Sequence, residues 1–197
     1  MQKSNLTKGM IHLKERYERR VIPHFLKELG YKNRLAVPRM LKVVVNVGVG
    51  SLLKNDSNSK ELGEAVEQDL AFITAQKPVQ TKSKKSIAAF GTRRGQMLGF
   101  KVTLRGKRMM DFLERLVNLA LPRTRDFFGI PVTSFDQKGN LTIGIKEHTV
   151  FPEVGRGERG QKVKKIFGFE ITVVTNAQSK EEGISLFKMM GFPLALE

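Results

Sequence analysis

The chain has 197 residues, 40% of them hydrophobic, so it can bury a core, and we expect one domain over residues 1–197. It has no cysteine, which excludes disulfides, thiolate nucleophiles and cysteine-ligated zinc. Its formal net charge of +16 favours a polyanionic partner, above all a nucleic acid. The sequence has no apolar run of about 18 residues and no apolar secretory segment near its start, so we expect no membrane partner.

The first predicted elements are a long helix and a strand. Residues 7–29 carry apolar side chains at four-residue steps, with Pro23 as a kink or restart and Gly30 as the stop. Residues 39–50 follow Pro38 and predict a strand with two different faces. One face holds Leu41, Val43, Val45 and Val47, and the other holds Lys42, Val44 and Asn46. Asn46 is therefore expected on a face that RNA could contact.

A helix with an acidic outer face is predicted next, over residues 58–73. Asn58 and Glu61 form a capping box at its start. Its outer face holds Glu61, Glu64, Glu67 and Asp69. Because these carboxylates repel phosphate, we expect the helix to point away from a nucleic acid. The helix ends at residues 76–78, and residues 79–86 predict a short strand with alternating lysines.

The rest of the chain is organised around residues 84–108, which read as a glycine-punctuated basic loop that leads into a strand. The apolar face of this strand is Leu98, Phe100, Val102 and Leu104, and the polar face is Gly99, Lys101, Thr103 and Arg105. Residues 77–125 contain 13 Lys and Arg but only two acidic residues, a net charge of +11. Most of the positive charge of the chain thus surrounds this strand, as expected of a polyanion-binding surface.

Residues 109–120 predict a helix that Pro122 ends, followed by a basic and aromatic turn. Within that turn, Arg123 and Arg125 could either contact a partner or cap the carbonyl groups at the end of the helix. Two strands are expected at residues 132–135 and 141–145, joined as a hairpin. The sequence leaves the role of the two arginines open.

The C-terminal part predicts a basic loop, a strand and a helix. The loop covers residues 152–166, and the strand covers residues 167–175, with Phe167 and Phe169 on its core face. Ser179 opens a helix with a capping box, and Gly191 ends it. Taken together, the elements predict an α+β fold, an antiparallel sheet with helices packed on one face and long basic loops.

Motifs for catalysis or cofactor binding are missing. Gly155, Gly157 and Gly160 match the spacing GxGxxG, but Pro152 precedes them and no amphipathic helix follows. The three histidines are single and far apart in sequence, and no HxxxH or GxxxxGK[ST] motif is present. We therefore expect no enzyme activity, no metal site and no cofactor.

Six blocks follow one another along residues 8–194 almost without gaps. They are VPRMLKVVVNVGVG, AQKPVQTK, KKSIAAFGTRRGQMLGFKVTLRGKRMMDFLERLVNLALPRTRDFFGI, SFDQKGNLTIGI, VFPE and KEEGISLFKMMGFP. This series resembles the bacterial-type family of large-subunit ribosomal protein number five. The resemblance implies a cytoplasmic ribosomal protein that attaches 5S rRNA in the central protuberance of the large subunit.

The resemblance also implies roles for particular residues. Those expected near 5S rRNA are Asn46, Gln76, Lys77, Thr103 and Arg105, joined by Lys42 and Lys101 on the same polar strand faces. Arg93, Arg94 and Gly95 match the loop that contacts peptidyl-site tRNA. Arg123, Arg125 and Phe128 match the segment that bridges to small-subunit ribosomal protein thirteen. Large-subunit rRNA and other central-protuberance proteins are the remaining expected partners.

Two other functional classes make different predictions. A non-ribosomal RNA-binding protein or RNA chaperone would stack bases on exposed aromatic rings, so Phe167 and Phe169 would have to lie on the surface. A nuclease would need several acidic residues gathered around a metal ion in a basic field. The sequence shows no such gathering of acids.

Overall fold

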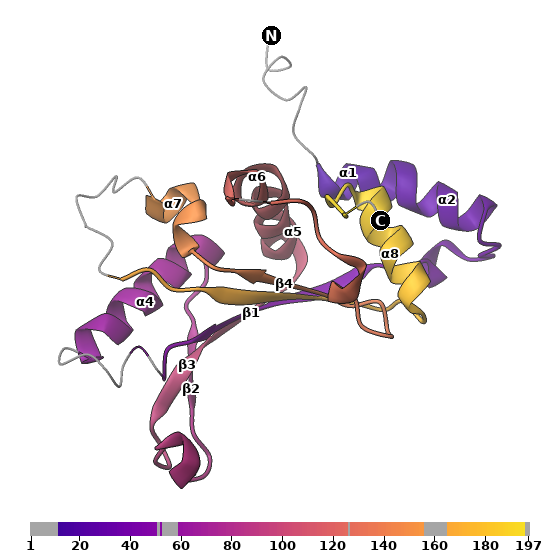
Figure 1. Cartoon of the computed structure of the whole chain (residues 1–197). Coiled ribbons are helices and arrows are strands. Elements are labelled where there is room, and N and C mark those ends of the chain that lie inside the picture. The colour runs from indigo at the N-terminus through magenta and orange to yellow at the C-terminus, as the bar shows by residue number, and fades with distance from the viewer. Residues whose placement is uncertain (1–11, 51, 53–58, 126, 156–164, 196–197) are drawn as a thin grey trace.

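The computed structural model describes residues 12–50, 52, 59–125, 127–155 and 165–195, which contain a five-stranded antiparallel sheet (Figure 1). In chain order the strands are β1 (Met40–Gly48), β2 (Val79–Lys82), β3 (Met97–Leu104), β4 (Leu141–Ile145) and β5 (Phe169–Thr175). Across the sheet their order is β2-β3-β1-β5-β4. The first strand of the chain is therefore the central one, and its two neighbours come from distant parts of the sequence.

Helices gather on one side of the sheet (Figure 1). They are α1 (Leu13–Arg16), α2 (Ile22–Lys27), α4 (Ser59–Thr74), α5 (Gly106–Arg115), α6 (Leu121–Arg123), α7 (Pro152–Gly155) and α8 (Lys180–Met190). The core lies between the two layers, where Val45 of β1, Phe112 of α5 and Phe187 of α8 are fully buried. The predicted α+β fold with helices on one face is confirmed. Of the expected basic loop at 152–166, the first residues form α7 and residues 156–164 lie outside the described residues.

Side chains of β1 and β3 alternate between the two faces as predicted, except at Leu41. Leu98, which was expected on the apolar face of β3, is only half-buried. The buried set is Val43, Val45, Val47, Phe100, Val102 and Leu104. Leu41 was expected with this set but is 41% exposed, while Met40 is buried. The register between β1 and β5 shifts between Met40 and Lys42. A β-bulge therefore adds one residue to β1 and turns Leu41 outward.

Pro23 and Pro122 each follow a turn of π-helix. Residues Tyr17–Val21 form one such turn before Pro23, and residues Leu116–Ala120 form the other before Pro122. A proline ring crowds the carbonyl of the preceding turn and offers no N–H, and the wider π turn accommodates both defects. The helical path consequently continues through Pro122 to Arg123. The prediction that Pro122 ends the helix is therefore wrong by one residue, since the helix ends at Arg123.

The predicted hairpin is correct in β4 but wrong in its first strand. Residues Val132–Ser134 form a 3-10 turn after Pro131. Phe135 makes an isolated bridge to Leu141, whereas β4 pairs along its whole length with β5. The β-branched residues of the segment favour a strand locally, but tertiary pairing decides the outcome.

Phe167 and Phe169 are buried, with 3% and 5% of their surfaces exposed, as the core interpretation predicts. The ring of Phe167 stacks on the imidazole of His148 at a centroid distance of 3.9 Å. The Phe167 N–H donates to Nδ1 of His148 at 3.3 Å, and His148 is itself fully buried. Neither phenylalanine offers a surface on which an RNA base could stack.

Candidate nucleic-acid interface

The sheet face opposite the helices, here called the open face, follows from the strand register. Residues directly opposite one another in antiparallel strands point to the same side of the sheet. Asn46 of β1 lies opposite Lys101 of β3 and Glu170 of β5, so these three share a face. By the same register the side chains of the open face are Lys42, Val44, Asn46, Val79, Thr81, Lys101, Thr103, Thr142, Glu170, Thr172 and Val174.

The open face is cationic and amide-bearing on one half and mainly hydroxyl-bearing on the other. Asn46 and Lys101 are exposed on the adjoining strands β1 and β3. On the other half, the hydroxyls of Thr142 and Thr172 lie 3.3 Å apart and can satisfy each other. Lysine ammonium groups bind phosphate, whereas an amide can bond to ribose hydroxyls or base edges. The β1–β3 half thus carries the chemistry suited to RNA.

Gln76 and Lys77 join this half of the open face from the side. They lie between α4 and β2, and the Gln76 Nε2 donates to the backbone carbonyl of Thr103 at 3.4 Å. Lys77 is exposed, while the following Pro78 is buried. A residue before proline favours an extended backbone, so Lys77 leads directly into the edge strand β2. The connection therefore extends the polar surface beyond β3.

Arg105 completes the group at the end of β3. It is the exposed N-terminal flanking residue of α5, with an extended backbone. Val43 is paired with Leu104, and their chain neighbours Lys42 and Arg105 lie one residue beyond this pair. All seven residues expected near 5S rRNA therefore lie on the open face or at its border.

Two groups of interface candidates were not predicted from the sequence. Lys107 and Arg108 are exposed in the first turn of α5, where the helix dipole disfavours cations. Because two cations at the start of a helix are unfavourable by themselves, their position could have indicated an anionic partner. Glu170 and Thr172 were missed because β5 was considered only for its buried face, although the same alternation places them on the open one.

Residues 83–96 form the tip of a hairpin that extends away from the helices (Figure 1). The tip is held by its own hydrogen bonds: Ser83 N–H donates to Gln96 O at 2.8 Å, and Gly95 N–H donates to Ser83 O at 2.9 Å. Arg93 and Arg94 are exposed there. Gly95 has φ +83°, a conformation that favours glycine. The two arginines are thus presented at a distance from the open face.

Arg123 is the last residue of α6, and Arg125 and Phe128 follow it closely in the chain. Thr124 donates from its backbone to Leu121 O and from its hydroxyl to Ala120 O, each at 3.1 Å. These two helix-end carbonyls are therefore satisfied without the arginines. Arg123 and Arg125 are exposed, and Phe128 is 89% exposed. An aromatic side chain so exposed is an obvious candidate for a protein contact.

The acidic helix α4 lies on the other side of the sheet from Asn46. Gln80 of β2 pairs with Phe100, whose side chain is in the core, so Gln80 points toward the helical layer. There its Nε2 donates to Glu67 of α4 at 3.4 Å. The carboxylate face is consequently separated from the lysines of the open face by the sheet itself.

Within the described part of the chain, neither a membrane-spanning helix nor a metal cluster is found. No helix there is long and apolar enough to cross a bilayer. Nor do three or more His, Asp or Glu side chains come together there as possible ligands of a metal ion.

Comparison with known proteins gives a consistent result over nearly the whole chain. Residues 33–93 match the family model "Ribosomal protein L5", and residues 97–194 match the model of the C-terminus of the same ribosomal protein family. A relative from Mesoplasma florum, named large ribosomal subunit protein uL5, is 49% identical over 93% of this chain and 97% of its own length. A protein of the same name from Halothermothrix orenii is 50% identical over 92% of this chain and 97% of its own length.

Proposed function

This chain belongs to the ribosomal protein L5 family, as a structural protein of the large ribosomal subunit in the cytoplasm and not an enzyme, and from this premise we propose that it binds 5S rRNA through the open face. In this proposal the chain attaches 5S rRNA in the central protuberance, next to large-subunit rRNA and other ribosomal proteins. The β1–β3 half of the open face is the contact surface.

One observation carries the proposal: seven residues from three segments of the chain lie on the open face or at its border. They are Lys42, Asn46, Gln76, Lys77, Lys101, Thr103 and Arg105. The group combines lysine and arginine charges, which neutralise phosphates, with amide and hydroxyl groups, which can bond to ribose and bases. The acidic helix α4 lies behind the sheet, where it does not oppose an approaching phosphate backbone.

Two further contacts are part of the proposal. Arg93 and Arg94 at the hairpin tip contact peptidyl-site tRNA, because the tip projects beyond the body of the sheet (Figure 1). The segment with Arg123, Arg125 and Phe128 contacts small-subunit ribosomal protein thirteen. Its exposed aromatic ring and two cations support a protein contact better than a buried structural role.

The test is a binding titration of the purified chain with isolated 5S rRNA at several salt concentrations. We expect tight binding. The logarithm of the association constant should fall linearly with the logarithm of the salt concentration, because cations on the open face release counterions from phosphates. A transfer RNA serves as the comparison RNA and should bind more weakly. Equal affinity for both RNAs, or an affinity independent of salt, would reject the proposal.

A further inference from the structure

The C-terminal turn of α4 connects the helical layer to the border of the open face. Ala75, the residue after α4, has φ +51° and is the one non-glycine residue with positive φ among the described residues. Helices commonly end in this left-handed conformation, but with glycine, since a side chain there is strained. Gln76 and Lys77 follow immediately, so their position depends on a turn that the sequence itself disfavours.

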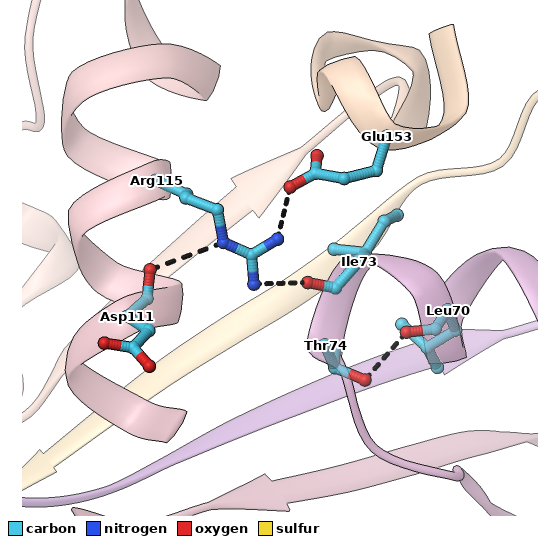
Figure 2. Close-up of polar contacts among 6 residues, drawn as sticks. All are labelled: Leu70, Ile73, Thr74, Asp111, Arg115 and Glu153. Atoms are coloured by element: carbon cyan, nitrogen blue, oxygen red, sulfur yellow. Dashed lines mark hydrogen bonds and ion pairs between the residues drawn. The ribbon is translucent and has the colours of Figure 1, made fainter. Parts of the chain in front are cut away.

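Arg115 of α5 holds the last turn of α4 in place (Figure 2). Its Nη2 donates to the carbonyl of Ile73 at 3.0 Å. The same guanidinium pairs with the carboxylate of Glu153 in α7, and its Nε donates to Asp111 O at 3.4 Å. A planar guanidinium with acceptors from three helices has little freedom to move. Its charge is also favourable at the C-terminal end of a helix.

Thr74 links this turn to Gln76. Its side chain is almost fully buried, and its hydroxyl lies 2.7 Å from Leu70 O and 3.0 Å from Gln76 O. Figure 2 shows Thr74 beside Leu70, one residue beyond the carbonyl that Arg115 contacts. Gln76 in turn reaches the Thr103 carbonyl of β3. A continuous series of contacts thus runs from the Arg115 guanidinium to the border of the open face.

We propose that Arg115 and Thr74 are positioning residues for RNA binding, which fix the left-handed turn at Ala75 and so present Gln76 and Lys77 to 5S rRNA. This inference rests on the proposed function. Neither positioning residue touches RNA in this arrangement, because both lie in the helical layer and act through the turn.

The experiment measures the affinity of folded variants for isolated 5S rRNA, with thermal unfolding to show that each is folded. Arg115→Gln and Thr74→Val should each weaken binding about three- to tenfold, as expected when one polar contact of the complex is misplaced. The slope of the salt dependence should fall by at most about one phosphate contact, because Lys77 moves together with Gln76. Arg19→Gln is the matched control: Arg19 also pairs with a glutamate, Glu15, but lies elsewhere in the helical layer, and its loss should change affinity less than twofold.

Two combinations separate positioning from general destabilisation. Ala75→Gly removes the strain, so in the Arg115→Gln background it should restore part of the lost affinity. Combined with the double variant Gln76→Ala, Lys77→Ala, Arg115→Gln should add little further loss, since these changes act through the same two side chains. Combined with Asn46→Ala, its effect should be additive.

The outcomes distinguish a failure of the proposed 5S rRNA binding from a failure of the positioning role. If wild-type protein does not bind 5S rRNA, the proposed function is wrong. If wild type binds but folded Arg115→Gln and Thr74→Val bind equally well, the positioning role is wrong. Additive losses for Arg115→Gln with the double variant Gln76→Ala, Lys77→Ala would overturn it as well, even if the single variants bind weakly.

Discussion

The two faces of the sheet are made by alternate residues of the same strands, yet one face packs in the core and the other is exposed. Val45 is fully buried, and the next residue, Asn46, is exposed on the open face. Leu104 and Arg105 differ in the same way at the end of β3. Because period-two alternation separates the two kinds of residue, a substitution on one face should change folding and a substitution on the other should change binding.

The largest expected effect comes from the core side. Phe167→Ala should lower the free energy of unfolding by about 3–5 kcal/mol, because it removes a buried ring that stacks on His148. Chemical denaturation measures this loss. The fraction that remains folded should bind 5S rRNA as wild type does. An RNA chaperone that stacks bases on this ring would show the reverse, with unchanged stability and weakened binding.

The next effect comes from the open face. Asn46→Ala should weaken 5S rRNA binding by roughly 1–3 kcal/mol if the RNA group that bonds the amide is left unpaired in the complex. Its melting temperature should stay within about a degree of wild type, because surface changes of this kind cost little stability. A loss of stability comparable to that of Phe167→Ala would show that the two faces are not separable.

Alternation explains how much of this arrangement the sequence could predict. The strands β1, β3 and β5 were predicted with their buried faces because hydrophobic residues recur at every second position. Leu41 was misplaced because a bulge depends on the pairing of β1 with β5, which local pattern does not contain. The 3-10 turn at Val132–Ser134 was missed for a similar reason, since β5 takes the place next to β4.

The candidate interface was predictable to the same extent. Lys101 and Thr103 follow from alternation alone, whereas the assignment of Gln76 and Lys77 came from the family resemblance. Their approach to Thr103 depends on a left-handed residue at position 75, and an alanine there gives no sign of it. The stabilising contact from Arg115 comes from a helix 42 positions away in sequence from its acceptor Ile73. No local pattern could have indicated it.

A smaller effect is expected at the hairpin tip, which belongs to neither face of the sheet. The double variant Arg93→Ala, Arg94→Ala should leave 5S rRNA affinity and thermal stability nearly unchanged, because both side chains are exposed and away from the open face. Peptidyl-site tRNA should bind assembled ribosomes more weakly by about 1 kcal/mol in total, the scale of exposed charge contacts. Filter binding of tRNA to ribosomes carrying the variant measures this. Failure of the variant to bind 5S rRNA would assign the tip to the 5S interface.

The smallest effect is expected within the helical layer. The hydroxyl of Tyr31 donates to Oε1 of Glu182 in α8 at 2.7 Å. Burial, and then the hydrogen bond and negative charge of Glu182, raise the pKa of Tyr31 from 10.0 to about 12. Because the folded-state pKa is the higher one, this contact contributes fully below pH 10 and is lost as the pH rises towards about 12.

Tyr31→Phe removes the hydroxyl and should abolish this part of the pH dependence of stability. The net loss at neutral pH should be small, because the pair is partly exposed to solvent. Denaturant unfolding of both proteins between pH 8 and pH 12, near the range set by the raised pKa, makes the comparison. The difference between wild type and variant should shrink as the pH rises. A constant difference over the whole range would show that folding does not raise the pKa of Tyr31.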